Sequence, residues 1–185
     1  TRPADWHAGD AAGNELFKMG SGANHLTFQD IDISNVGTAF RASADIADIT
    51  VQHVDVHNAR RFFEDLASSG TASVSGLTIR DVTVTGFSRE AIRLQYDTHD
   101  VVIENVRGDM AGQVGDDLPE GIHLDGTVHD VLIRDTTMAN VQSVGSGSTS
   151  SMSRQSRDHS HGPRAVPGVH RDRRGDHQEG GGLPR

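Results

Sequence analysis

Five segments of the chain share one pattern of eleven residues and align without gaps. They are LTFQDIDISNV from Leu26, ITVQHVDVHNA from Ile49, LTIRDVTVTGF from Leu77, VVIENVRGDMA from Val101 and VLIRDTTMANV from Val131. Positions 1, 3, 6, 8 and 11 of the pattern are apolar in 23 of 25 places, and the exceptions are Gly108 and Thr136. Alternation with a period of two is typical of strands, so each copy is predicted to be two short strands with a corner at the extra residue between them. The recurrence indicates a repeat architecture.

A third strand is expected upstream of each copy. Apolar residues stand nine and seven positions before four of the copies, as Phe17 and Met19, Phe40 and Ala42, Ile92 and Leu94, and Ile122 and Leu124. The remaining coil needs an insertion after Phe63, and we place Phe62 and Glu64 in its two inward positions. The copies start 23, 28, 24 and 30 residues apart, which suits single coils of a solenoid. We therefore predict an all-β fold, a right-handed parallel β-helix with three strands per coil and about five coils.

Position 10 of the pattern supports this prediction independently. It is occupied by Asn35, Asn58, Gly86, Met110 and Asn140. Asn and Gly tolerate the left-handed backbone of a sharp bend between strands. Stacked on successive coils, the asparagine amides are expected to form a hydrogen-bonded ladder, with Met110 as a local interruption.

With these repeats, residues 15 to 142 resemble the pectin lyase-like superfamily of parallel β-helix proteins, which includes pectate and alginate lyases, polygalacturonases and uronan epimerases. The resemblance is one of fold, because no catalytic motif of the superfamily is matched. It implies a secreted or cell-surface bacterial protein that acts on acidic polysaccharide. Enzymes of this superfamily are usually longer, and the chain opens without Met, so we expect a fragment.

The repeat ends near Gln142. We divide the chain into an N-terminal segment with a partial first coil (residues 1–25), the β-helix (26–142) and a tail (143–185) that is expected to be disordered. Net charge changes at the same boundary, from −12 before residue 143 to +3 after it. The tail has seven Arg and no Lys, which favours an out-of-frame reading of GC-rich coding sequence over a native linker.

Composition narrows the functional classes. The chain has no Cys, so disulfides and cysteine metal sites are excluded. No run is long enough to cross a membrane. The acidic β-helix with one Trp and one Tyr argues against nucleic acid as a partner. We expect a monomer whose partner is an acidic polysaccharide.

The candidate binding surface is the outward side of the third strand. One file of side chains there reads Lys18, Arg41, Arg93 and His123, and the neighbouring file reads Gly20, Ser43, Gln95 and Asp125. The placement of Phe62 and Glu64 adds Phe63 and Asp65 to these files. Like charges one coil apart repel, so a basic stack needs interleaved acids or an anionic ligand. A solvated polar face that binds nothing is the alternative.

The loop GQVGDDLPEGIHLDG before the last copy is the second candidate. Asp116, Asp117 and Glu120 lie on it, directly before His123 and Asp125. Carboxylates of this kind are ligands for Ca²⁺, the one cofactor that we predict, although a solvated acidic loop would have the same composition.

Two chemistries remain open. In β-elimination from a uronate, Arg93 or Ca²⁺ would neutralise the carboxylate and His123 would take the proton alpha to it. In hydrolysis, Asp65 and Asp125 would flank the scissile bond. A non-catalytic adhesin or carbohydrate-binding stalk is the third possibility, and Lys18, Arg41 and Gln95 would bind sugar in any of the three.

Overall fold

The computed structural model describes residues 15–66, 72–111, 113 and 119–141. These residues form strands and no helix. The strands are β1 (Glu15–Met19), β2 (Leu26–Ala42), β3 (Ile46–Asp65), β4 (Ser73–Phe87), β5 (Ile92–Leu94), β6 (Asp97–His99), β7 (Val101–Asp109), β8 (Ile122–Leu124), β9 (Val131–Arg134) and β10 (Thr137–Ala139). The described part of the chain thus holds no helix able to cross a membrane. The predicted tail from residue 143 lies outside it.

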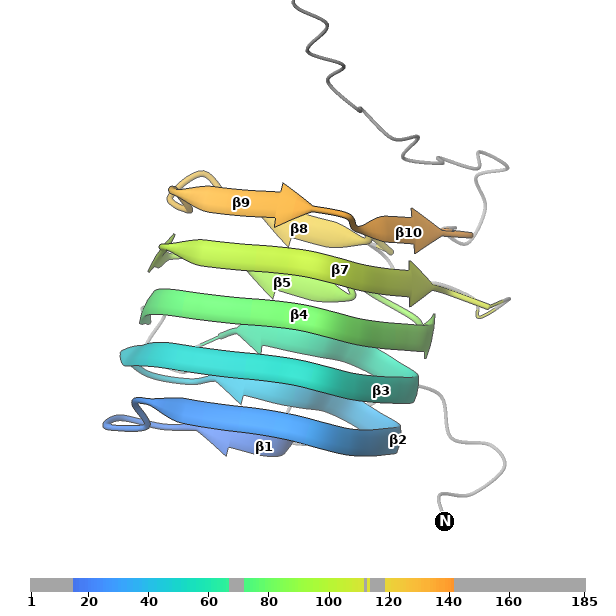
Figure 1. Cartoon of the computed structure of the whole chain (residues 1–185), viewed down its shortest axis with the longest axis horizontal. Coiled ribbons are helices and arrows are strands. Elements are labelled where there is room, and N and C mark those ends of the chain that lie inside the picture. Colours follow the sequence, from blue (N-terminus) through green and yellow to red (C-terminus); the bar gives the residue numbers. More distant parts are fainter. Residues whose placement is uncertain (1–14, 67–71, 112, 114–118, 142–185) are drawn as a thin grey trace, which may run out of the picture. The chain divides into compact units, whose positions relative to one another are not determined.

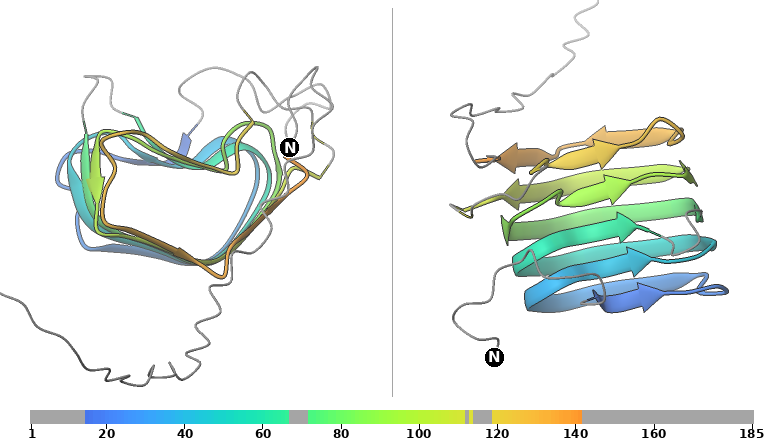
Figure 2. Two further views of the ribbon diagram at one scale, coloured as in Figure 1. Left: turned by 90° about the horizontal axis from the view of Figure 1, so that it is seen from above. Right: turned by 180° about the vertical axis from the view of Figure 1, so that it is seen from behind.

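The strands wind into a parallel β-solenoid of about four turns. The chain runs from left to right along the front, returns along the back and rises with each coil, which is a right-handed path (Figure 1). Viewed along the axis, the coils superimpose around one interior (Figure 2). Five copies of the repeat enclose four turns, because a turn is completed only when the next copy begins. The predicted fold class is confirmed.

Strand pairing follows the predicted register of the repeat. Leu26 pairs with Ile49, Ile49 pairs with Leu77, and Val101 pairs with Val131. The third strands also stack as expected, since Phe17 pairs with Phe40 and Ile92 pairs with Ile122. The inward apolar residues of the central coils are fully buried, among them Ile49, Leu77, Ile79 and Ile103. Each coil therefore covers the apolar surface of its neighbour.

The corners of the coils are built from residues with a left-handed backbone. At position 10 this conformation is found in Asn35, Asn58, Gly86 and Asn140, as predicted. It also occurs at position 5 and at the residue before each copy, where the sequence analysis did not foresee it; these residues are Asp30, His53, Asp81, Asn105, Asp135, His25, Asp48, Gly76, Asp100 and Asp130. Asn58 Nδ2 donates to Asn35 Oδ1 at 2.7 Å, so part of the expected asparagine ladder is present.

The register predicted for the segment RRFFED is wrong by one residue. Phe63, not Phe62, pairs with Phe40 and Ile92, and Glu64 pairs with Arg41 and Arg93. The amides of Phe62 and Phe63 both donate to the carbonyl of Ala91, at 2.9 and 3.1 Å. The register is unbroken on both sides, because Arg61 pairs with Thr38 and Glu64 pairs with Arg93 at the same offsets. Phe62 stands where the adjacent coils have Ala39 and Ala91, and all three are fully buried, as is Phe63.

Candidate functional site

The third face of the solenoid consists of β1, the ends of β2 and β3, β5 and β8, and its outer file carries the predicted basic residues. The shift of the register by one residue places Glu64 in this file where Phe63 was expected, so the file reads Lys18, Arg41, Glu64, Arg93 and His123. An acid thus separates the lower two cations, Lys18 and Arg41, from Arg93, which relieves their repulsion. The expectation of an unbroken basic file is corrected.

A buried ionic network lies behind this file. Arg61 Nε donates to Glu90 Oε2 at 2.6 Å, and Arg61 Nη1 donates to Glu64 Oε2 at 2.9 Å. Thr38 Oγ1 donates to Glu64 Oε1 at 3.1 Å. Burial alone would raise the pKa of Glu90, but the hydrogen bond and charge of Arg61 outweigh it and the pKa is lowered. Glu90 is therefore a buried carboxylate that is held ionised.

The two lower cations differ in their access to solvent. Arg41 is 7% exposed, forms an ion pair with Glu15, and donates from Nε to the carbonyl of Leu66 at 2.8 Å. Its guanidinium is thus engaged within the fold. Lys18 is exposed at the lower end of the file. Of these two predicted sugar-binding residues, only Lys18 presents its charge to solvent.

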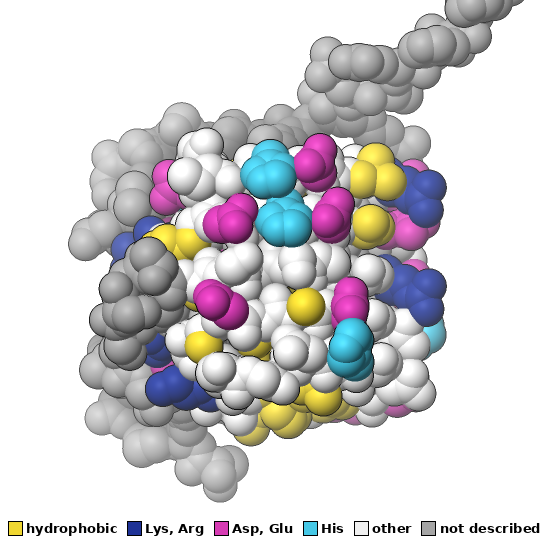
Figure 3. Space-filling model, turned by 90° about the vertical axis from the view of Figure 1, so that its left-hand side faces the viewer, with side chains coloured by type: hydrophobic (Ala, Val, Ile, Leu, Met, Phe, Trp, Pro, Cys, Tyr) yellow, Lys and Arg dark blue, Asp and Glu magenta, His cyan; other side chains and the backbone are white. Residues whose placement is uncertain are grey.

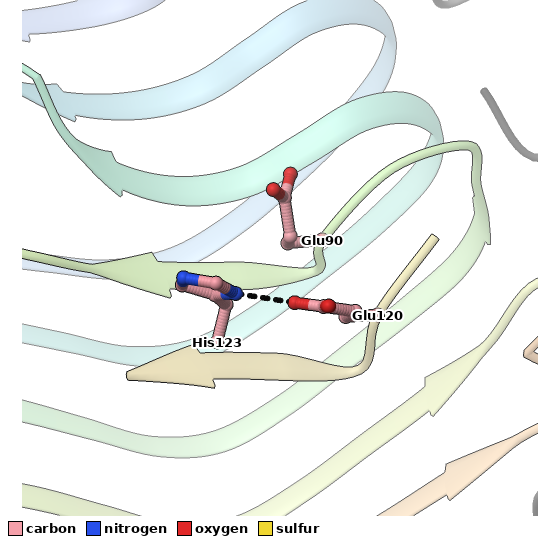
Figure 4. A group of neighbouring side chains, drawn as sticks. All are labelled: Glu90, Glu120 and His123. Carbon is pink, nitrogen blue, oxygen red and sulfur yellow. Dashed lines mark hydrogen bonds and ion pairs between the residues drawn. The ribbon is translucent and has the colours of Figure 1, made fainter. Parts of the chain in front are cut away.

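His123 and Glu120 form a hydrogen-bonded pair at the upper end of the file. The imidazole Nδ1 faces the Glu120 carboxylate, and the second ring nitrogen points away from it (Figure 4). The side chains are 29% and 41% exposed, so both reach solvent. A carboxylate beside Nδ1 favours the proton on that nitrogen, which leaves Nε2 as the basic atom. The arrangement fixes the orientation of a histidine that is accessible from outside.

Arg93 lies directly beneath His123 in the register of β5 and β8. Its side chain is 25% exposed, and its Nη1 lies 3.9 Å from Glu90 Oε1. Among the described residues, Glu90 Oε1 and Arg93 Nε are buried without a hydrogen-bond partner. Buried polar atoms are normally satisfied, so these two atoms are an exception behind the partly exposed His123.

Asp65 occupies an inward position of the third face and not the predicted outer file, because it pairs with the inward Ala42. It has no exposed surface, so it does not reach a polysaccharide on the outside. Its carboxylate oxygens each lie 2.8 Å from the backbone nitrogen of Gln95, and Gln95 Nε2 donates to its carbonyl. Gln95 is 6% exposed. These two predicted site residues therefore bind each other inside the wall.

Thr98 and burial act on Asp65 in opposite directions. Thr98 Oγ1 donates to Asp65 Oδ2 at 2.6 Å and also lies 2.8 Å from the carbonyl oxygen of Gln95. Burial raises the pKa of Asp65 from its ordinary 3.8 to about 7, although Thr98, Gln95 and the charge of Arg93 act in the opposite direction.

This raised pKa predicts an unusual dependence of stability on pH. Between about pH 4 and pH 7 the folded chain binds a proton at Asp65 that the unfolded chain has released, so stability falls as pH rises through this window. The shift corresponds to about 4 kcal/mol as an upper bound, at 1.36 kcal/mol per pH unit. Asp65→Asn keeps a donor towards Thr98 and an acceptor for Gln95, and we expect it to be more stable than the parent at pH 8 and similar to it at pH 4.

Urea unfolding of both proteins at the two pH values measures this difference. Asp55→Asn, at an exposed aspartate of β3, is the matched control and should change neither midpoint. An Asp65→Asn protein that is less stable than the parent at pH 8 would show that Asp65 is ionised and required as a carboxylate.

The predicted calcium ligands are only partly described. Asp116 and Asp117 lie outside the described residues, and Glu120 bonds to His123. Asp125 is exposed, and its Oδ1 accepts from the amide of Gly126 at 3.1 Å. The calcium site, and a catalytic role for Asp125, therefore stay predictions.

One other group has the composition of a metal site. Ligand atoms of Glu90, Glu120 and His123 lie within 4.8 Å of one another. The Glu90 carboxylate, however, points away from the other two side chains (Figure 4) and faces Arg61 and Arg89, at 2.6 and 3.3 Å from its Oε2. Nearby guanidinium groups oppose a cation at this place. The geometry favours proton chemistry at His123 over metal binding.

A second surface cluster lies on another corner and was missed by the sequence analysis. The rings of His99 and His129 stack with centroids 5.1 Å apart, and acidic side chains flank both histidines (Figure 3). His129 Nδ1 lies 2.8 Å from Asp130, and its Nε2 lies 3.6 Å from Asp97. The hydrogen bond with Asp130 raises the pKa of His129. The charged side chains of this corner therefore pair with one another at the surface, and no ligand is needed to explain them.

Comparisons of the chain with protein-family models, curated proteins and solved structures found no match. The β-helix fold is established by the strand pairing alone, and membership of the pectin lyase-like superfamily stays a prediction. Function must therefore be argued from the side chains of the third face.

Proposed function

We propose that the third face binds an acidic polysaccharide and that His123 acts as the base of a β-elimination. The observation that carries this proposal is the paired geometry of Glu120, His123 and Arg93. Glu120 orients the imidazole so that Nε2 is available to accept a proton. The guanidinium of Arg93 comes from the adjacent coil, about 4.8 Å away in a parallel sheet.

The two groups match the requirements of elimination from a uronate. A cation beside the sugar carboxylate stabilises negative charge as the proton alpha to it is removed. The proton passes to His123 Nε2, the electron pair forms the new carbon–carbon double bond, and the bond to the glycosidic oxygen in the beta position breaks. The departing oxygen takes a proton from solvent. Arg93 thus has a role in binding and in charge stabilisation.

The structure gives less support to hydrolysis by the predicted pair of carboxylates. Two carboxylic groups must flank the scissile bond on the surface for that reaction. Asp125 is exposed, but Asp65 is enclosed by Gln95 and Thr98. A non-catalytic carbohydrate-binding solenoid is the second candidate. It is favoured by the ion pairs that His123 and Arg93 already form with Glu120 and Glu90. These pairs compensate the charges of the face without a substrate.

The contribution of Arg93 to binding is tested by Arg93→Gln, which removes the charge without placing a second carboxylate beside Glu90. We expect affinity for a polyuronate to fall at least about tenfold, and stability to change little because the side chain is partly exposed. Raising the ionic strength from about 0.01 M to 1 M should weaken binding of the parent, since the screening length falls from about 30 Å to 3 Å. Calorimetric titration measures both effects.

Arg80→Gln is the matched control for this measurement. Arg80 is exposed on a different wall of the solenoid and bonds to Gln52. The Arg80→Gln protein should bind the polyuronate with the same affinity as the parent. Equal affinity of the Arg93→Gln and Arg80→Gln proteins would show that the third face is a solvated wall and not a binding surface.

A further inference from the structure

The upper end of the solenoid exposes residues that are buried in every central coil. Leu124 and Ile133 are 42% and 41% exposed, whereas Leu94 and Ile103, at the same positions one coil below, have no exposed surface. Strands β8, β9 and β10 pair only with the coil beneath them among the described residues. No described residue pairs with their other edges, and an open strand edge is a template for another strand.

The lower end is the counterpart of this surface. Strand β1 pairs only with β2 in the described part of the chain, and residues 26–36 of β2 pair only with β3. Phe17, Leu26, Phe28 and Ile31 of this end coil are only partly buried. Both ends therefore contain apolar side chains that are partly exposed to solvent. These side chains lie next to strand edges with which no described residue pairs.

We propose that these two ends bind each other, so that copies of the chain stack head to tail along the solenoid axis. The argument is that the repeat stays in register across the junction. Continuing the observed pairing by one coil places these residues of the upper end against these residues of the next copy: Val131 against Leu26, Ile133 against Phe28, Ile122 against Phe17, and Leu124 against Met19. Each of these contacts joins two apolar side chains, of which at least one is partly exposed in the single chain. Met138 and Ile33 also come into register but are already buried.

Polar contacts continue across the junction in the same way. Asn35 of the next copy would lie above Asn140. The hydrogen bond between the side-chain amides of Asn58 and Asn35 would be repeated there. Lys18 of the next copy would stand one coil above Glu120, in the relation that Arg41 has to Glu15 within the chain. The junction thus joins opposite charges on the third face. One like-charge contact opposes it, between Asp135 and Asp30 of the next copy.

Head-to-tail stacking joins two different surfaces, so each added copy exposes a fresh end. Such heterologous contacts build open filaments when no rotation closes them into a ring. A second copy is the occupant that the observations favour, since it supplies the matching apolar positions, the asparagine ladder and the charge pair. The proposed assembly, whose size depends on protein concentration, differs from the monomer that the sequence predicts.

Sedimentation of the full chain over about a hundredfold range of concentration tests this proposal. We expect the mean mass to rise with concentration, and Leu124→Glu to reduce the association at least tenfold while circular dichroism keeps its β signal. Leu132→Glu is the matched control. Leu132 lies in the same end coil and is 49% exposed, but it sits at position 2 of the repeat, on the outer side of the wall, and should leave association intact.

A mixing experiment separates stacking from other self-association. Leu26→Glu blocks the lower end and Leu124→Glu blocks the upper end, so neither protein should form filaments alone, whereas their mixture should form a dimer through the two intact ends. A parent protein that stays monomeric at every concentration would overturn the proposal. It would also be overturned if Leu124→Glu associates as strongly as Leu132→Glu, or if the mixture stays monomeric.

Discussion

Ile103→Asp is expected to unfold the β-helix. Ile103 has no exposed surface and pairs with Ile79 below and Ile133 above, in the middle of the stacked core. An unpaired carboxylate at this position costs several kcal/mol, against a total stability of about 5 to 15 kcal/mol for a folded domain. The far-ultraviolet β signal and the cooperative urea transition should both be lost at neutral pH.

Val102→Asp is the matched control for this experiment. Val102 is the preceding residue of β7, and it is only partly buried because alternate residues of a strand point to opposite sides. This variant should fold with a small loss of stability. If Ile103→Asp is folded and soluble, the assignment of inward and outward positions is incorrect.

His123→Ala is expected to abolish turnover of an acidic polysaccharide while binding is retained. Loss of a positioned general base lowers rates by about 10²- to 10⁴-fold. Affinity should change little, because Arg93 remains in place. Initial rates and calorimetric affinities, measured on the same substrate, separate the two quantities.

Two further variants make this result specific. His99→Ala removes a partly exposed histidine from a different corner and should leave turnover unchanged. Glu120→Gln keeps the imidazole but weakens its orientation, so it should lower turnover less than His123→Ala and alter its pH profile. Turnover within tenfold of the parent in the His123→Ala protein would remove His123 from the reaction.

The fold was predictable because the same pattern of apolar residues occurs in five copies. Each inward position recurs in every copy, so isolated exceptions such as Gly108 and Thr136 do not obscure the period. The strand register of four third strands followed from the same spacing. The left-handed backbone was predicted at the asparagines but missed at the aspartates and histidines, because a polar residue in this conformation resembles any other solvated side chain in the sequence.

The register at Phe62 and Phe63 was not decided by alternation alone. Alternation with a period of two fits either phenylalanine as the inward residue, and both are fully buried. The distance from the start of the copy is decisive, since Phe63 stands fourteen residues after Ile49 as Phe40 does after Leu26. The error moved Asp65 outward and left Glu64 out of the outer file.

The ionic partners of the third face recur in the sequence. In every coil the residue of the outer file and the residue three positions before it form a pair: Glu15 and Lys18, Thr38 and Arg41, Arg61 and Glu64, Glu90 and Arg93, and Glu120 and His123. Four of the five pairs join an acid with a basic side chain. This recurrence indicates the Glu120–His123 pair and the buried network from the sequence alone.

The proposed elimination is tested most directly by the release of unsaturated uronate, which absorbs near the ultraviolet edge. The chain should be incubated with a panel of acidic polysaccharides and with a neutral glucan as control. We expect absorbance to rise with at least one polyuronate, to stay flat with the glucan, and to stay flat in every case for His123→Ala. If the chain binds a polyuronate through Arg93 but releases no unsaturated product from any member of the panel, elimination is contradicted and the solenoid is a binding module.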